Sequence, residues 1–216
     1  MLSREVKALR KRIVGFWDMS PGSVTPALAV LAAAFAAGAL TGLLLAAQVG
    51  GEGQESLSAY LQVYLEAART GNATPPEPAA ALWEAARWPL LTLLLSFTAL
   101  GAVGIPAIFA VRGFLLSFAV ASFVRIFGGA GAILAFFAFG FTGTISLPVL
   151  FLLGVQGLLS ALARAGQAMG GGKGPTAPPG RAFWLRSGLC AAGLVLSALL
   201  ECWAVPALLA SVAELF

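Results

Sequence analysis

The stretch that decides the fold is residues 24–48, VTPALAVLAAAFAAGALTGLLLAAQ. It has about 25 residues and no charged side chain, which is long enough for a helix to cross the ~30 Å hydrocarbon core of a bilayer. Its Gly38-x-x-x-Gly42 spacing allows another helix to approach closely. A basic segment, residues 1–23, precedes it, as in signal peptides, but their apolar core is only about 7–15 residues long. We therefore predict an uncleaved anchor, span 1, after a cytoplasmic basic N-terminus.

The composition of the 216-residue chain is that of a membrane protein. Apolar residues make up 59% of it and charged residues 10%, whereas a soluble domain carries roughly 25% charged residues. Histidine is absent, which excludes a Ser-His-Asp triad and a histidine-based metal site. Cys190 and Cys202 would lie about 18 Å apart on one helix, too far for a disulfide, and are expected to be buried apolar residues. We predict a non-enzymatic protein without a metal or cofactor.

Further apolar runs predict more spans after a polar segment. We assign residues 89–111 to span 2 and residues 113–127 to span 3, with a cytoplasmic corner at Arg112–Gly113. The glycine-rich residues 128–131 predict a turn on the opposite side of the membrane.

The next run, residues 132–163, is too long for one straight crossing and too short for two. Its Gly140–Pro148 stretch combines helix breakers with hydroxyl side chains. This predicts a broken helix or a short re-entrant piece, followed by span 4 from about Thr144 to Ala163. Residues 187–209 are span 5. The predicted fold is all-α, a polytopic membrane helical bundle of about five spans in a single membrane domain, residues 1–216.

Residues 49–88 are the sizeable polar segment between predicted spans 1 and 2. Apolar side chains recur within it at helical spacing, which predicts a short amphipathic helix on the outer side. Its apolar positions are candidate partner contacts: Leu57, Tyr60, Leu61, Tyr64 and Leu65. The helix either lies flat on the outer leaflet or docks a partner domain, and the sequence leaves both open.

Lysine and arginine are distributed unequally between the two sides of the predicted spans. Ten fall on one side: five in residues 1–23, Arg112, and four in the flexible linker 164–186. The other side has Arg69 and Arg87 with five glutamates. Because basic residues mark the cytoplasmic side, we predict a cytoplasmic N-terminus and an outer C-terminus in the cell membrane. These clusters flank apolar spans rather than an aromatic-rich polar stripe, so nucleic acid is not an expected partner.

A few polar residues fall inside the predicted spans, where a charge costs a few kcal/mol. Arg125 and Glu201 would lie about 18 and 21 Å from the inner face. We expect them to pair or to face one polar cavity; alternatively, Arg125 reaches the outer headgroups. Glu201 is a candidate for proton coupling, although a structural hydrogen bond is the simpler interpretation. Thr142, Thr144 and Ser146 either line a substrate path or, the favoured interpretation, hold helices together.

Two stretches carry a family resemblance. The first runs from Gly101 to Phe118, and its motif residues are Gly104, Pro106, Arg112 and Gly113. The second runs from Ser197 to Pro206, and its motif residues are Glu201 and Pro206. With the order of elements over almost the whole chain, they resemble the stage II sporulation protein M family. Departures are Ser117, where members often have glycine, and the Gly140–Pro148 stretch, which differs from the proline-bearing break expected there.

The resemblance implies a membrane scaffold of spore-forming bacteria that cleaves nothing itself. Members are understood to hold two peptidoglycan-degrading partners, stage II sporulation proteins D and P, at the septal membrane during engulfment of the forespore. The outer segment 49–88 would contact these partners. A transporter or permease-like component is the alternative, because a broken helix and intramembrane charges are common in transporters. The lipid bilayer is the expected surrounding, and a homo-oligomer is compatible with the sequence.

Overall fold

A computed structural model describes residues 21–48, 78–169 and 181–213, together with the single positions Glu55, Ala59 and Val63. The elements are α2 (Pro21–Gln48), α4 (Pro78–Ser96), α5 (Gly101–Ala135), the π-helical turn η1 (Phe136–Gly140), α6 (Phe141–Ala168) and α7 (Arg181–Ala213). Every element in these ranges is a helix. The predicted all-α class is therefore confirmed for the described part of the chain.

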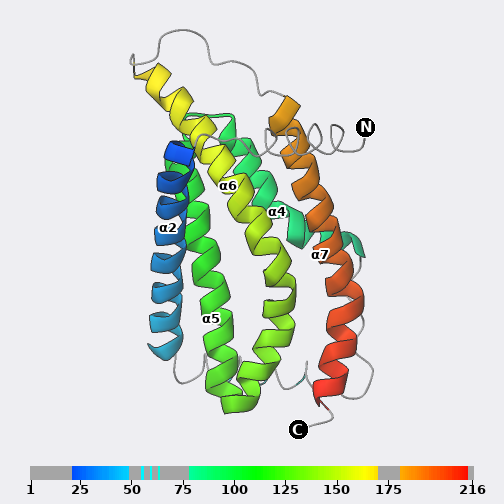
Figure 1. The fold of residues 1–216 in the computed structure, drawn as a ribbon. Helices are drawn as coiled ribbons and strands as arrows, with labels where there is room; N and C mark the ends of the chain where they lie inside the picture. The colour runs from blue at the N-terminus through cyan, green and yellow to red at the C-terminus, as the bar shows by residue number, and fades with distance from the viewer. Residues whose placement is uncertain are drawn as a thin grey trace, which may run out of the picture.

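The helices form one elongated bundle (Figure 1). α2, α5 and α7 run in the same direction, and α6 runs back between them. α4 starts midway down the bundle and ends beside the start of α5. One end of the bundle thus gathers the start of α2, the α4–α5 corner, the end of α6 and the start of α7.

Three helices are long and apolar enough to cross a membrane: Ser23–Gln48, Gly101–Gly129 and Gly143–Ala168. Their lengths of 26, 29 and 26 residues correspond to about 39–44 Å of helix, more than the ~30 Å core requires. Only 17% and 22% of the most apolar windows of the first two are buried in the bundle. The remaining apolar surface needs lipid around it, so the protein is membrane-embedded.

The predicted corner at Arg112–Gly113 is wrong. α5 continues as a helix through both residues, and the corner lies instead at residues 97–100, between α4 and α5. The predicted spans 89–111 and 113–127 are therefore replaced by α4 and the first part of α5. A 15-residue span 113–127 would measure only about 22 Å. A continuous helix from Gly101 crosses the core while keeping its backbone groups hydrogen-bonded.

The predicted glycine turn after Phe127 is confirmed. Gly128 has φ 60° and ψ −134°, a backbone conformation that is open to glycine and costly for other residues. Gly131 then lies against the part of α5 that precedes the turn, because a Cβ on it would be 2.0 Å from the Phe123 carbonyl oxygen. The chain reverses here and starts back through the membrane (Figure 1).

The break predicted at Gly140–Pro148 is displaced. The irregularity is the π-helical turn Phe136–Gly140, and α6 runs regularly from Phe141 through Pro148 to Ala168. Thr144 Oγ1 donates a hydrogen bond to the Gly140 carbonyl oxygen at 2.7 Å, which helps to satisfy the backbone where the two helix types join. The predicted span 4, from about Thr144 to Ala163, lies within α6, in a stretch that is long and apolar enough to cross a membrane.

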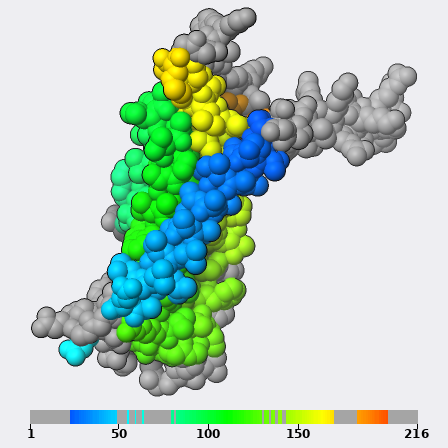
Figure 2. Space-filling model, turned by 90° about the vertical axis from the view of Figure 1, so that its left-hand side faces the viewer, coloured from blue at the N-terminus to red at the C-terminus, as the bar shows by residue number. Residues whose placement is uncertain are grey.

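α2 packs mainly on α5, and glycine makes this contact possible. Figure 2 shows α2 lying diagonally across the bundle. A Cβ on Gly38 would be 1.8 Å from the Ala110 carbonyl oxygen, and one on Gly113 would be 2.2 Å from the Phe35 carbonyl oxygen. Ser117 Oγ donates across the contact to the Ala39 carbonyl oxygen at 2.6 Å. The close approach predicted from Gly38-x-x-x-Gly42 is confirmed.

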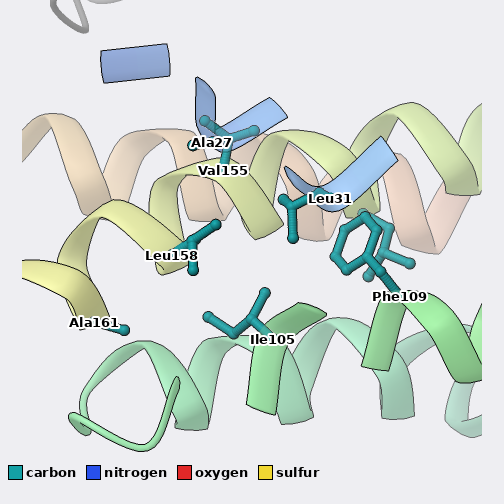
Figure 3. Close-up of a cluster of buried hydrophobic side chains, with 8 residues drawn as sticks. Ala27, Leu31, Ile105, Phe109, Val155, Leu158 and Ala161 are labelled. Atoms are coloured by element: carbon teal, nitrogen blue, oxygen red, sulfur yellow. The ribbon is translucent and has the colours of Figure 1, made fainter. Parts of the chain in front are cut away.

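The apolar core lies where α2, α5 and α6 meet. Its buried residues are Ala27, Leu31, Ile105, Phe109, Leu150, Val155, Leu158 and Ala161 (Figure 3). Phe109 reaches into α6, where it meets Phe151 edge-on at 4.8 Å between ring centroids. Its ring occupies the space that a Cβ on Gly154 would need, at 2.4 Å. Glycine on α6 therefore admits a large ring from α5.

Replacing Gly38 by alanine should destabilise the bundle by about 1–3 kcal/mol, the usual range for overpacking, because the added methyl meets backbone of α5. The free energy of unfolding in mixed detergent micelles measures the effect. Gly188→Ala is the matched control: Gly188 is also helical and has nothing within 4 Å of an added Cβ, so alanine should be neutral or mildly stabilising. Equal stability of the two variants would contradict the packing described.

Candidate functional site

A cavity of about 360 Å³ lies where α4, α5, η1, α6 and α7 converge. We call it the central cavity. Its charged and polar lining side chains come from four of these elements: Glu84, Arg87 and Trp88 on α4, Arg112 on α5, Ser146 on α6 and Ser197 on α7. Apolar residues from α5, η1, α6 and α7 complete the wall. Charged groups from separate helices thus share one space inside the bundle.

Arg112 places a positive charge in the middle of a membrane-crossing helix. It lies eleven residues after Gly101, about 16 Å along the Gly101–Phe127 part of α5, which is about 40 Å long. A charge at such depth is costly, and intramembrane charges usually face a bundle interior or a cavity. Arg112 does so: its guanidinium carbon is 5.9 Å from the centre of the Trp88 ring.

α4 supplies the other charges of the cavity. Glu84, Arg87 and Trp88 stand three and four residues apart and so share one side of the helix. Arg87 Nη2 is 2.7 Å from Glu84 Oε2, and its guanidinium carbon is 5.4 Å from the centre of the Trp88 ring. Trp88 therefore lies near two guanidinium groups, each within the ~6 Å range of cation–π attraction.

Two buried donors of the central cavity have no hydrogen-bond partner among the described residues. They are Arg87 Nε and Trp88 Nε1. A buried donor without a partner costs free energy, and native structures contain few of them. These N–H groups can therefore receive an acceptor from a molecule that enters the cavity.

A second, apolar groove continues from the central cavity. It has a volume of about 610 Å³ and runs between α5, η1 and the start of α6. The groove and the central cavity share four lining residues: Leu116, Phe139, Gly143 and Leu147. Phe136, on the groove wall, is 64% exposed, so the groove opens to the outside of the bundle. We call it the lateral groove.

Arg125 does not lie at the depth predicted for it. Because α5 begins at Gly101, Arg125 is about 36 Å along this helix, in the last turn before Gly128. Its Nη1 donates to the carbonyl oxygens of Ala46 and Ala47, at 2.5 and 3.0 Å, at the end of α2. A cation there complements the helix dipole and the carbonyls that have no intrahelical donor. Glu201 belongs to α7, its side chain lies outside the described residues, and its pairing with Arg125 stays a prediction.

Arg164 serves the opposite end of the bundle in the same way. Its Nη1 donates to the Ser96 carbonyl oxygen, at the end of α4, and to the Ser160 carbonyl oxygen at 3.2 Å. Its guanidinium carbon is 5.7 Å from the centre of the Phe97 ring. Arginines from α5 and α6 therefore cap the ends of α2 and α4.

The other predicted polar positions separate in the structure. Ser146 lines the central cavity and Thr144 the lateral groove, while the side chain of Thr142 lies outside the described residues. Cys190 is buried with its thiol free. The partner-contact candidates Leu57, Tyr60, Leu61, Tyr64 and Leu65 lie outside the described residues.

The residues of the family resemblance occupy structural positions on α5. Gly104 leaves room for Leu95 of α4, whose Cδ1 would be 2.9 Å from an added Cβ. Pro106 lies inside the helix, Arg112 lines the central cavity, and Gly113 contacts α2. The backbone of Pro206 lies in α7, and its side chain is outside the described residues.

Sequence reasoning missed the central cavity because it placed Arg112 on the cytoplasmic side and Arg87 on the outer side. The shortness of the predicted span 113–127 was the signal that would have moved the corner upstream and put Arg112 inside a helix. It also missed Gln156, a buried α6 residue whose Nε2 lies 3.4 Å from the Phe183 carbonyl oxygen of α7. No histidine, cysteine, aspartate and glutamate cluster of metal-binding size occurs in the described ranges.

Comparisons with protein-family models, with curated proteins and with solved structures give no match to this chain. The family resemblance therefore rests on the motif residues, since the corner at Arg112–Gly113 that formed part of the expected element order is a continuous helix.

The two capping arginines predict separable local effects. Arg125→Gln should increase amide hydrogen exchange in the last turn of α2, and Arg164→Gln should do so at the end of α4, because each loses a cation that accounts for about 0.3–2 kcal/mol at a helix end. Hydrogen exchange with mass spectrometry in detergent resolves both segments. Each variant is the control for the other, and the same pattern in both would contradict separate capping roles.

Proposed function

We propose that this chain is a non-catalytic integral membrane scaffold, similar to stage II sporulation protein M. In this proposal it organises peptidoglycan-remodelling partners, with stage II sporulation proteins D and P as candidates, at the septal membrane during sporulation. The observation that carries the proposal is the position of the resembling residues on α5. Gly104 and Gly113 set the distances to α4 and α2, so the motif maintains the arrangement of the bundle.

We further propose a five-pass topology in which α4 is the short second pass. The start of α2, the end of α6 and the start of α7 share one end of the bundle (Figure 1). The basic segments 1–23 and 164–186 adjoin that end and contain nine of the thirteen lysines and arginines. The positive-inside rule then favours a cytoplasmic N-terminus and an outer C-terminus. The part of the predicted outer segment 49–88 that precedes α4, residues 49–77, is the proposed partner-contact region.

A transporter or permease-like component is the second candidate function. One observation favours it: charged residues from α4 and α5 line one cavity of the bundle, and intramembrane charges commonly mark substrate or ion pathways. Recovery of an ATPase subunit rather than cell-wall hydrolases with the protein would favour this candidate.

The proposed topology can be tested by cysteine labelling in a background without Cys190 and Cys202. Gly129→Cys lies at the exposed turn inside α5, next to Gly128, so a membrane-impermeant maleimide should label it in intact spheroplasts. Lys173→Cys lies in the linker 164–186 and should react only after the membrane is permeabilised. Labelling of Lys173→Cys in intact spheroplasts would reverse the orientation and contradict the proposal.

The proposed scaffold function can be tested by crosslinking and affinity purification from detergent extracts of sporulating cells. The wild-type chain should recover cell-wall hydrolases, and a Tyr60→Ser, Tyr64→Ser variant of the predicted amphipathic helix should recover at least several-fold less. Val103→Ala, on a lipid-exposed face of α5 where the side chain is 78% exposed, is the matched control and should recover the same amount. Absence of any hydrolase with the wild-type chain would overturn the scaffold proposal.

A further inference from the structure

We propose that the central cavity is a water-filled vestibule, which enters the bundle from one side of the membrane and ends near its middle. Water reaches Arg112 and Trp88 but does not pass beyond them. Such a solvent path goes beyond the proposed scaffold function, which needs no water at that depth. Its presence does not depend on whether the chain recovers cell-wall hydrolases.

The charged residues that line the central cavity lie at the depth of the membrane core. Arg112 is about 16 Å along the roughly 40 Å of α5 that precede Gly128. Its guanidinium carbon is 5.9 Å from the centre of the Trp88 ring, so Trp88 of α4 lies at a similar level. Glu84 and Arg87 are within four residues of Trp88 on the same helix, at most about 6 Å along its axis. The charges of the cavity are therefore well inside the membrane.

The ion pair on α4 is deep in the membrane and yet exposed. Arg87 Nη2 is 2.7 Å from Glu84 Oε2, and the two side chains are 40% and 53% exposed. A charged group that faces hydrocarbon is costly, and intramembrane charges instead face the interior of a bundle or a water-filled cavity. Both residues of this pair line the central cavity. Water in the cavity accounts for an exposed ion pair at this depth.

The polar groups and the size of the central cavity suit water. Arg87 Nε and Trp88 Nε1 are buried donors with no hydrogen-bond partner among the described residues, and a water molecule can accept from each. Ser146 adds a hydroxyl group to the wall. One water needs about 10–15 Å³ of such space and two to four polar partners, whereas the cavity measures about 360 Å³. It has room for a group of waters that also hydrogen-bond to one another.

Tight packing of α4 on α6 closes the vestibule toward the α4–α5 corner. One turn after Trp88, the Thr92 side chain is fully buried and donates to the Trp88 carbonyl oxygen at 2.9 Å. One turn further, a Cβ on Gly157 of α6 would be only 3.1 Å from the Cβ of Ser96. None of Thr92, Ser96 and Gly157 lines the cavity. The vestibule therefore ends at the level of Trp88.

The test is the reaction of single cysteines with a cationic methanethiosulfonate reagent, in a background without Cys190 and Cys202. The reagent attacks thiolates, which form in water and not in hydrocarbon. Opened membrane vesicles expose both faces of the membrane, so the outcome does not depend on the proposed orientation. Two cavity positions accept cysteine with little change in volume: Ala85 on α4 and Ala119 on α5.

Val111→Cys is the matched control for Ala85→Cys. Val111 precedes Arg112 on α5, its side chain is 46% exposed, and it lines neither the central cavity nor the lateral groove. It therefore faces lipid at the depth of the cavity. Ala85→Cys should react at least about tenfold faster than Val111→Cys, because only the first thiol meets water.

Leu44→Cys is the matched control for Ala119→Cys. Leu44 is 61% exposed on α2 and lies two residues after Gly42, where an added Cβ would be 2.5 Å from Ser117 Oγ of α5. The two positions therefore have similar depths. Ala119→Cys should again react at least about tenfold faster than its control. Thr92→Cys, beyond the closed end, should react as slowly as the lipid-facing controls.

Equal rates at the cavity and lipid-facing positions, whether all fast or all slow, would overturn the proposal. Fast reaction of Thr92→Cys would also overturn it, because water would then continue past Trp88. The two matched pairs lie on different helices, so one pair decides alone if a variant of the other does not fold.

Discussion

The close contact between α2 and α5 is the constraint on which the rest of the structure depends. In lipid, apolar side chains gain little by leaving the solvent, so helix association relies on dense packing and on interhelical hydrogen bonds. Both are present here: glycines at positions 38 and 113 bring backbone against backbone, and Ser117 donates to α2. Serine replaces the glycine expected by resemblance at this position, and it adds a hydrogen bond to the contact.

Once α2 and α5 are fixed side by side, the positions of the charged residues follow. Arg125 reaches the end of α2 because the two helices run in parallel with their ends aligned. The long part of α5 before Gly128 carries Arg112 into the interior, where α4 meets it with Trp88 and Arg87. An arginine at a helix end donates hydrogen bonds to carbonyl groups that have no intrahelical donor. An arginine in the middle of a membrane helix instead needs a cavity to hold its charge.

The part of the bundle most relevant to function is the region where the helices do not pack tightly. Around the α2–α5 contact, small residues allow little free space. Around η1 and the start of α6, Gly140 and Gly143 leave a groove that joins a charged cavity. π-helical turns are frequent at functional sites because they redirect side chains without ending the helix. A scaffold would keep a bound molecule in this region, whereas a transport component would move a molecule through it.

The sequence by itself determined that lipid surrounds most of the chain, that its secondary structure is helical, and where several local features lie. Long uncharged runs specify helices in lipid, the Gly38-x-x-x-Gly42 spacing specifies a close helix contact, and Gly128 specifies a turn, because each depends only on nearby residues. Tertiary structure decided the corner between α4 and α5 and the location of the polar site. Gly113 is compatible with a turn or with a close helix contact, and only the presence of α2 beside it selects the second. The depth of Arg112 follows from that selection, so the central cavity required the assembled bundle.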